Sequence, residues 1–359
     1  MAIEFLEITN FRNLRHVCLE PSPRLNLVIG KNGSGKTSLL ESLYFLGTAR
    51  SFRTPHNKKL ISLGEQQFSL FAKVRHKDRS QAVGIIRDQT QAKIKIAGHL
   101  VKSASQLADI LAVQLINPDA HKLLEEGPRF RRRFIEWGVF HVEPKYFPAW
   151  QQCRVVLKQR NAALKMRVST RELKHWDETL CKITSVVDSF RQNYLAKLVP
   201  HINTLLASVP GLPIITLSLV HGWPKDCSLA EALAAAADSD KEKGFTQYGP
   251  HRADLRIKAD GLKAKELISR GQQKLITALF KIAQLRLLNE HRPECSSLLL
   301  LDDLPAELDA TYREVLMDIV GDLNNTQSYV TATEHNFIDP LVNGTEGARV
   351  FHVEHGSIA

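Results

Sequence analysis

One glycine-rich stretch decides the fold class of this chain: Gly30-Lys31-Asn32-Gly33-Ser34-Gly35-Lys36-Thr37. The apolar run Leu25 to Ile29 precedes it, and Ser38 to Tyr44 follows it with the pattern of a helix. A strand, a tight loop and a helix in this order are the context in which G-x-x-x-x-G-K-[ST] binds the phosphates of a nucleotide. The sequence therefore predicts an α/β fold that binds a nucleoside triphosphate.

The residue types of this loop suit a polyphosphate. Glycines let backbone N–H groups turn toward the phosphates, and the start of the following helix adds the positive end of its dipole. Lys36 is expected to contact the β- and γ-phosphates as a catalytic group, and the Thr37 hydroxyl to ligate Mg²⁺. We assign all eight residues, Gly30 to Thr37, to nucleotide binding, with ATP and Mg²⁺ as the expected ligands.

The bulk properties fit a soluble protein with a polyanionic partner. The 359 residues are 43% hydrophobic and carry a net charge of +10. Met1 to Phe5 leads directly into a predicted strand, so we expect no signal peptide, and no apolar run approaches the roughly 20 residues needed to span a bilayer. Five scattered cysteines are typical of reduced thiols, which favours a cytoplasmic location and no membrane partner.

The positive charge is concentrated between residues 129 and 174, where 12 Lys and Arg face 3 Glu, a balance of 12 − 3 = +9. Such a concentration favours contacts with the phosphate backbone of DNA, although a run of charge is more often only a solvated face. The candidates for DNA contact are Arg129, Arg131, Arg132, Arg133, Lys158 and Arg160.

Hydrophobic periodicity divides the chain into three parts. Residues 1–117 alternate as strands around the glycine-rich loop, and residues 244–359 return to alternating strands and helices. Residues 118–243 are helical in pattern, including a predicted helix from Glu172 to Ser208. We predict an ATPase lobe of mixed sheets, formed by the first and third parts, with an inserted basic helical lobe.

Two acidic residues complete the predicted nucleotide site. Asp302 and Asp303 directly follow the apolar strand Ser297 to Leu301. A core strand that ends beside a phosphate loop can deliver one carboxylate to Mg²⁺ and a second to the attacking water. We assign Asp302 to the metal and Asp303 to general base catalysis.

A second loop is expected to contact the nucleotide from another subunit. Ser269-Arg270-Gly271-Gln272-Gln273 opens a predicted helix about 30 residues before the acidic strand, as the signature loop does in ABC-type ATPases. Ser269, as a catalytic group, and Gly271 and Gln272 are assigned to the γ-phosphate, and Glu307-Leu308-Asp309 resembles the D-loop of that class. A simple helix cap is the alternative for this serine.

Three further assignments are less direct. Arg12 and Asn13 follow the first strand and either fold over the phosphate loop to contact the nucleotide or form a surface turn. Gln114 is the nearest candidate, by order, for the Q-loop glutamine. His335 follows the strand where a switch histidine is usual, but we assign it no such role.

Eight motifs together resemble the RecF family of bacterial recombination mediators and, more widely, the heads of SMC-type ATPases. They are Asn10-Phe11-Arg12-Asn13, Gly30 to Thr37, Arg50-Ser51-Phe52-Arg53, Pro128 to Arg133, Gln159-Arg160-Asn161, Gly249-Pro250-His251-Arg252, Ser269 to Lys274, and Leu299 to Asp309. The resemblance implies an ABC/SMC-type head that dimerises over two ATP molecules, binds DNA when ATP is bound, and hydrolyses ATP slowly. It also implies action with RecR and RecO to direct RecA onto single-stranded gaps.

Three other functions stay open at this point. The chain could be the nucleotide-binding subunit of an ABC-type complex that does not act on DNA, a P-loop nuclease, or a structural DNA clamp that does not hydrolyse ATP. The basic lobe argues against the first of these.

Overall fold

The computed structural model describes residues 2–77, 79–101, 103–303, 307–333 and 347–358. The chain divides into two compact units, which we call the head and the lobe. The head consists of Met1–Ala120 and Arg270–Ala359, and the lobe of His121–Ser269. Within the described residues, no helix combines the length and apolar character that crossing a membrane requires.

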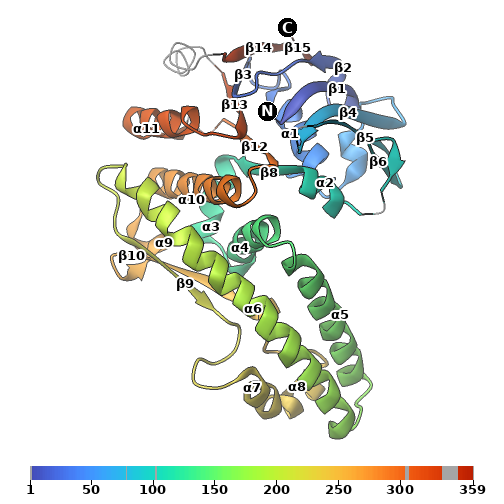
Figure 1. Ribbon diagram of the computed structural model, residues 1–359, viewed down its shortest axis with the longest axis vertical. Coiled ribbons are helices and arrows are strands. Elements are labelled where there is room, and N and C mark those ends of the chain that lie inside the picture. Colours follow the sequence, from blue (N-terminus) through green and yellow to red (C-terminus); the bar gives the residue numbers. More distant parts are fainter. Residues whose placement is uncertain (1, 78, 102, 304–306, 334–346, 359) are drawn as a thin grey trace. The chain divides into compact units, whose positions relative to one another are not determined.

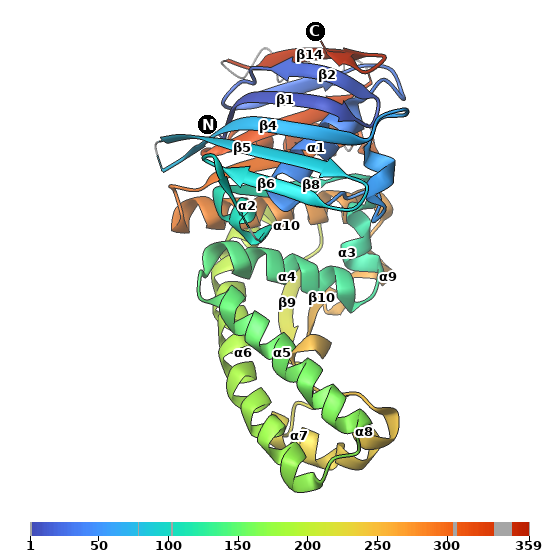
Figure 2. The ribbon, with the colours of Figure 1, turned by 90° about the vertical axis from the view of Figure 1, so that its right-hand side faces the viewer.

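The first sheet of the head is antiparallel throughout. Its six strands have the order β2-β1-β4-β5-β6-β7, and Figure 2 shows β2, β1, β4, β5 and β6 side by side. They are β1 (Ile3–Phe11), β2 (Leu14–Leu19), β4 (Gln67–His76), β5 (Arg79–Asp88), β6 (Ala92–Ile96) and β7 (His99–Leu100). Buried residues alternate along β4, as expected for a sheet with one face on the core and one on solvent. Strands β4, β5 and β6 lie within residues 1–117, the part of the chain predicted to alternate as strands.

The second sheet of the head is mainly parallel, with the order β15-β14-β3-β13-β12-β8. Its strands are β3 (Leu25–Ile29), β8 (Leu111–Ile116), β12 (Ser296–Leu301), β13 (Thr326–Ala332), β14 (Arg349–Glu354) and β15 (Ser357–Ile358). Every residue of β3, β8 and β13 is buried, because structure covers both faces of this sheet. Only β15 runs antiparallel to its neighbour.

Helix α1 (Lys36–Thr48) lies between the two sheets and joins them into one core (Figures 1 and 2). Leu39 and Leu43 of α1 belong to the same buried cluster as Ile8 of the first sheet and Tyr329 of the second. Among the described residues, the other α-helices of the head are α2 (Ser105–Ile110), α10 (Arg270–His291) and α11 (Ala310–Gly321). Because α1 begins at Lys36, the core that buries this helix also fixes the phosphate loop before it.

The lobe is built on two long antiparallel helices, α5 and α6, which lie side by side (Figure 2). Its elements are α3 (Lys122–Glu125), α4 (Pro128–Val142), α5 (Tyr146–Lys165), α6 (Thr170–Ala207), β9 (Ile215–Val220), α7 (Leu229–Ala235), α8 (Ala237–Lys243), β10 (Asp254–Ala259), β11 (Leu262–Lys263) and α9 (Ala264–Leu267). Helix α6 agrees closely with the helix predicted from Glu172 to Ser208. Ser169 begins it with a capping box, in which its side chain accepts a hydrogen bond from the backbone of Glu172.

The second boundary of the lobe differs from the prediction. We expected the ATPase part to resume at residue 244, whereas the lobe extends to Ser269. The physical reason is strand β10, which pairs with β9, a strand in a region predicted to be helical. Alternation within residues 254–259 reveals a strand but not the partner that it will join. The first boundary lies at Ala120 rather than at residue 117.

Candidate nucleotide-binding site

Three strand ends of the parallel sheet meet at one edge. Strand β13 pairs in parallel with β3 on one side and with β12 on the other, so all three carboxyl ends point the same way. In open parallel sheets, ligands bind at this edge. The phosphate loop follows β3, the pair Asp302 and Asp303 follows β12, and Thr331 lies near the end of β13.

The phosphate loop has the backbone that its glycines predict. Gly33 and Gly35 have φ angles of 78° and 130°, which side chains rarely tolerate. A Cβ atom at Gly35 would also lie 3.0 Å from Nδ2 of Asn13. Lys36 is 4% exposed, and its Nζ donates hydrogen bonds to the carbonyls of Gly30 at 2.8 Å and Lys31 at 3.2 Å. The ammonium group is thus held against the loop.

A threonine hydroxyl links the two aspartates behind this loop. Oγ1 of Thr331 lies 3.1 Å from Oδ1 of Asp302 and 3.2 Å from Oδ1 of Asp303, and accepts a 2.8 Å hydrogen bond from the backbone N–H of Asp303. The hydroxyl of Thr37 donates to Oδ1 of Asp302 at 3.1 Å. The structure therefore brings together the two residues that we assigned to the metal.

The carboxyl group of Asp302 lies in an unusual electrostatic environment. The side chain is 6% exposed, and this burial raises its pKa to about 6. The negative charge of Asp303 acts in the same direction, whereas hydrogen bonds from Thr37 and Thr331 oppose it. A buried carboxylate with a raised pKa gains from a cation beside it, because the cation compensates the charge that burial disfavours.

A hollow of about 510 Å³ opens in front of the loop. The residues that line it are Arg12, Asn13, Asn32, Gly33, Gly35, Lys36, Thr37, Ser38, Arg53, Lys59, Ile61 and Asp303. Four of these side chains are cationic and one is a carboxylate, so the hollow is suited to a polyanion. Of the predicted loop residues, Gly30, Lys31 and Ser34 do not line it.

Arg12 and Asn13 support the loop from the turn between β1 and β2. Asn13 donates from Nδ2 to the carbonyl of Ser34 at 3.0 Å and accepts from the Ser38 hydroxyl at 2.8 Å. Arg12 forms a bidentate pair with the fully buried carboxylate of Glu41, at 2.9 and 2.8 Å. Both residues line the hollow, and the described contacts of Asn13 hold the loop in place.

These residues fit a magnesium-bound triphosphate. The oxygens of Thr37 and Asp302 offer Mg²⁺ the hard ligands that it prefers. The hydroxyl of Ser34 is buried within the loop and has no hydrogen-bond partner among the described residues, so it is available to a phosphate oxygen. Lys36, Arg53 and Lys59 supply positive charge in the same hollow.

The signature residues lie at the start of α10 and do not line this hollow. Ser269 is exposed directly before the helix, and Gly271 and Gln272 form its first turn. Nζ of Lys274 pairs with Glu307 at 2.6 Å, which joins this end of α10 to the D-loop segment. Residues 304–306, which precede that segment, lie outside the described residues.

Gln114 and His335 were also considered in the sequence. Gln114 is buried on β8 and donates from Nε2 to Gln284 at 2.9 Å, and it does not line the hollow. The Q-loop hypothesis for Gln114 therefore gains no support. His335 lies outside the described residues.

Three of the arginines proposed for DNA contact have hydrogen-bond partners within the lobe. Arg160 is fully buried and paired with Asp177 and Asp240, so its assignment to DNA is wrong. Arg131 forms a bidentate pair with Asp254, and Arg132 donates to the carbonyl of Ala253. Such partners compete with any phosphate, so the assignment of Arg131 and Arg132 to DNA gains no support. Arg129, Arg133 and Lys158 are exposed.

Comparison with known proteins gives the same family as the motifs. The family model described as the RecF/RecN/SMC N terminal domain matches residues 2–358. The DNA replication and repair protein RecF of Stutzerimonas stutzeri (strain A1501) is 41% identical over 362 residues, covering 100% of this chain and 97% of the relative. The chain belongs to the RecF family. The RecF protein of Azotobacter vinelandii is 40% identical over 361 residues, covering 100% of this chain and 98% of the relative.

Solved structures agree with this assignment. A structure of the recombination mediator RecF with ATP matches with a TM-score of 0.87 and 25% identity, covering 100% of this chain and 97% of that one. The Smc head domain of Pyrococcus furiosus, bound to the C-terminal domain of ScpA, matches with a TM-score of 0.58 and 16% identity, which shows the fold alone. The predicted SMC-type head with mixed sheets and an inserted lobe is confirmed.

Four residues of this RecF-family site were missing from our assignments: Glu41, Arg53, Lys59 and Thr331. The buried Glu41 gathers Arg12, Arg53 and the Ser51 hydroxyl around one carboxylate. An acidic residue among the apolar positions of a predicted helix was the available signal for it. Arg53 belongs to a quoted family motif, but Lys59 carries no local signal.

Proposed function

We propose that this chain is an ATP-dependent DNA-binding protein of recombinational repair and replication-gap processing, which dimerises over ATP and hydrolyses it slowly. The observation that carries the proposal is the hollow lined by Lys36, Thr37 and Asp303, with Asp302 bound to the hydroxyl of Thr37. The names of the relatives, DNA replication and repair protein RecF, support the biological role.

The residues of the hollow have distinct parts in binding. The N–H groups of the phosphate loop and the ammonium group of Lys36 bind the phosphates, while Thr37 and Asp302 hold Mg²⁺. Bound Mg²⁺ would neutralise charge on the phosphate oxygens. Asp303 orients a water molecule, and its backbone and carboxylate are both fixed by Thr331. An aspartate is one methylene shorter than the glutamate usual in ABC-type ATPases, which fits slow turnover.

The position of the signature residues supports dimerisation. Gly271 and Gln272 are outside the hollow of their own head, and Ser269 is exposed at the start of a 22-residue helix whose dipole favours an anion. A second copy can place this helix end over the bound triphosphate. ATP binding and dimerisation would then be linked, since each ATP contacts both copies.

Two expectations about partners are carried into this proposal from the family resemblance. The chain would act with RecR and RecO, and indirectly on RecA, at single-stranded gaps in DNA. The rival functions are a subunit of an ABC-type complex without DNA and a DNA clamp without turnover.

The composite site is tested by mixing two variants. Asp303→Asn removes the base from one copy, and Ser269→Ala removes the hydroxyl that acts on the other copy. Each variant alone should lose most ATPase activity. In an equal mixture half of the dimers are mixed, and each of these has one intact site, so activity should recover to about a quarter of wild type.

Two results would contradict parts of the proposal. No recovery in the mixture would show that Ser269 does not complete the partner's site. Sedimentation should also detect a dimer with ATP and Mg²⁺ but not with ADP, and Lys36→Met should abolish dimerisation and tight DNA binding together. Tight DNA binding by Lys36→Met would refute the coupling between ATP and DNA.

A further inference from the structure

We propose that one face of helix α5 binds the sugar–phosphate backbone of DNA. The face is formed by Arg154, Lys158 and Lys165, and we call it the α5 cationic face. The inference rests on the proposed function, since it assumes that the chain binds DNA, and it says where the lobe does so. Within the arginine cluster at residues 129–133, Arg131 and Arg132 have partners inside the lobe, so we place the contact on α5.

The three cations share one side of the helix. They occupy positions i, i+4 and i+11, which a period of 3.6 residues places on one face. From Arg154 to Lys165 the helix rises about 16 Å at 1.5 Å per residue. This length spans about five nucleotides of one strand at 3.4 Å each.

Two hollows flank this face, and no carboxylate lines either of them. The first, of about 500 Å³, is lined by Arg154, Leu157, Lys158, Asn161, Ala162, Lys165 and His251. The second, of about 890 Å³, is lined by Pro148, Gln151, Gln152, Arg154, Val155, Val156, Lys158 and Ile183. Arg154 and Lys158 belong to both, so they form a ridge between the hollows.

The charges of this face are not neutralised by neighbouring side chains. Arg154, Lys158 and Lys165 are all exposed, and no ion pair joins them to another residue in the part of the chain that the structure describes. Arg154 has a longer-range electrostatic attraction to Glu136, without an ion pair between them. Arg131, by contrast, is already paired with Asp254.

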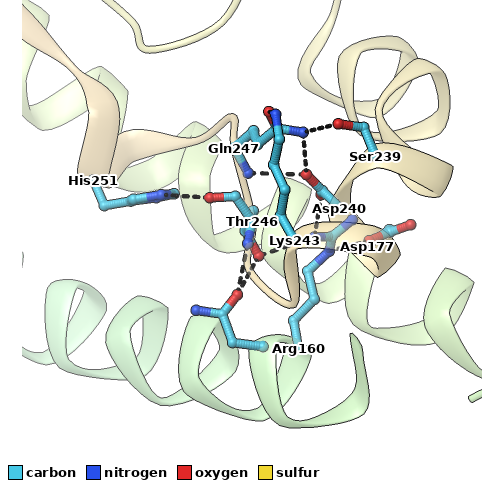
Figure 3. Close-up of polar contacts among 9 residues, drawn as sticks. Arg160, Asp177, Ser239, Asp240, Lys243, Thr246, Gln247 and His251 are labelled. Atoms are coloured by element: carbon cyan, nitrogen blue, oxygen red, sulfur yellow. Dashed lines mark hydrogen bonds and ion pairs between the residues drawn. The ribbon is translucent and has the colours of Figure 1, made fainter. Parts of the chain in front are cut away.

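The carboxylates of Asp177 and Asp240 are bound to the buried Arg160 and so do not pair with the α5 cationic face. Arg160 donates to Asp177 at 2.6 Å and to Asp240 at 2.7 Å, so one internal guanidinium binds two carboxylates (Figure 3). The guanidinium of Arg160 also donates to Thr246 at 2.9 Å. The side chain of Asn161, the next residue of α5, accepts two hydrogen bonds from Thr246.

The hydrogen bonds of Arg160 and Asn161 with Thr246 also help to position His251, which lines the first hollow. Thr246 is fixed by α5, and its carbonyl lies 3.1 Å from Nε2 of His251, which lines that hollow (Figure 3). Burial lowers the pKa of His251, so the ring is neutral near pH 7 and adds no charge of its own. The positive potential of the hollow therefore comes from the three exposed cations.

The apolar surface beside the ridge favours DNA over a compact anion. Val155 is 54% exposed and lines the second hollow with Ile183 and Pro148. A nucleic-acid strand alternates charged phosphates with apolar faces of sugars and bases, which matches a cationic ridge beside an apolar floor. Recognition of this kind would be independent of base sequence.

The test measures DNA affinity as a function of salt. The double variant Arg154→Gln, Lys158→Gln is compared with wild type and with Lys174→Gln, which removes an exposed charge of the lobe that lines neither hollow. Binding of a labelled gapped duplex is measured with ATP and Mg²⁺ between 0.05 and roughly 0.3 M salt. Because the replaced side chains are exposed, the melting temperature of each variant should equal that of wild type.

Each lost phosphate contact should reduce the slope of log K against log salt by about 0.9 on duplex DNA. The same relation gives about 8-fold weaker binding per cation at 0.1 M salt, or roughly 60-fold for the double variant. Lys174→Gln should change affinity less than 2-fold on that scale.

The outcomes separate this inference from the proposed function. If wild type binds DNA and the double variant binds equally well with the same slope, the α5 cationic face is not the site. The face would then be open to an acidic protein partner instead. If wild type itself does not bind DNA with ATP, the proposed function fails first.

Discussion

The ionised carboxylate of Asp302 should lower the free energy of unfolding at neutral pH, and Asp302→Asn should raise it again. The carboxyl group has a pKa of about 6 in the folded chain, against an ordinary value of 3.8. A difference of about 2.2 corresponds to about 3 kcal/mol, at 1.36 kcal/mol for each pKa unit. Asp302→Asn keeps the oxygen that accepts from Thr37 but removes the charge, so the variant without ligands should be more stable at pH 7.5.

The direction of the pH dependence follows from proton binding. A carboxyl whose pKa rises on folding binds more protons in the folded state between pH 3.8 and about 6. Stability therefore falls as the pH rises through this interval, and the full cost is present above it. About 1.4 kcal/mol of the change should fall between pH 5 and 7.5.

Urea unfolding at several pH values, without nucleotide or Mg²⁺, measures this effect. The advantage of Asp302→Asn over wild type should grow by about 1.4 kcal/mol from pH 5 to 7.5. The exposed Asp226→Asn controls for the loss of one negative charge. Any effect of the amide itself would change the free energy of unfolding by the same amount at every pH. If the difference in this free energy between Asp302→Asn and wild type does not change with pH, the reasoning is refuted.

Three further predictions concern side chains that support the two units. Arg160→Met should destabilise the protein by about 3–5 kcal/mol in urea unfolding, because the buried Asp240 loses its partner, and a loss below about 1 kcal/mol would contradict this. Glu41→Gln should weaken nucleotide binding roughly 10-fold in a fluorescence titration, because Arg12 loses a bidentate anchor, and unchanged affinity would show that Arg12 needs no such anchor. Ser169→Ala should lower stability by about 1 kcal/mol through loss of the α6 cap, whereas an unchanged urea midpoint would assign the cap no energetic role.

Local patterns were sufficient to predict most of the head. Alternation of apolar and polar residues predicted strands in the region of β4, β5 and β6, because such strands bury one face. Continuous apolar runs predicted β3 and β12, because these strands are buried on both faces. The phosphate loop was predictable because its backbone and its ligand groups lie within eight consecutive residues. The pairing of β9 with β10 was not, since it depends on a partner distant in sequence.

The sequence was least informative about which charged side chains are neutralised by a partner. The run at residues 129–133 and the isolated Arg160 read equally as candidates for DNA contact. The fold distinguishes these arginines. Arg131 pairs with Asp254, and Arg160 pairs with Asp177 and Asp240, all of which lie in other segments of the chain. Counting charges along the chain cannot anticipate such neutralisation.

The amino-acid sequence alone determined the phosphate loop, the acidic strand end, the family and the existence of an inserted lobe. Each depends on residues close together in the chain or on several motifs in a fixed order. Only the tertiary structure decided that Glu41 and Thr331 support the site, and which cations of the lobe are free to meet a phosphate. The physical reason is that burial and pairing are set by side chains that folding brings together across hundreds of residues.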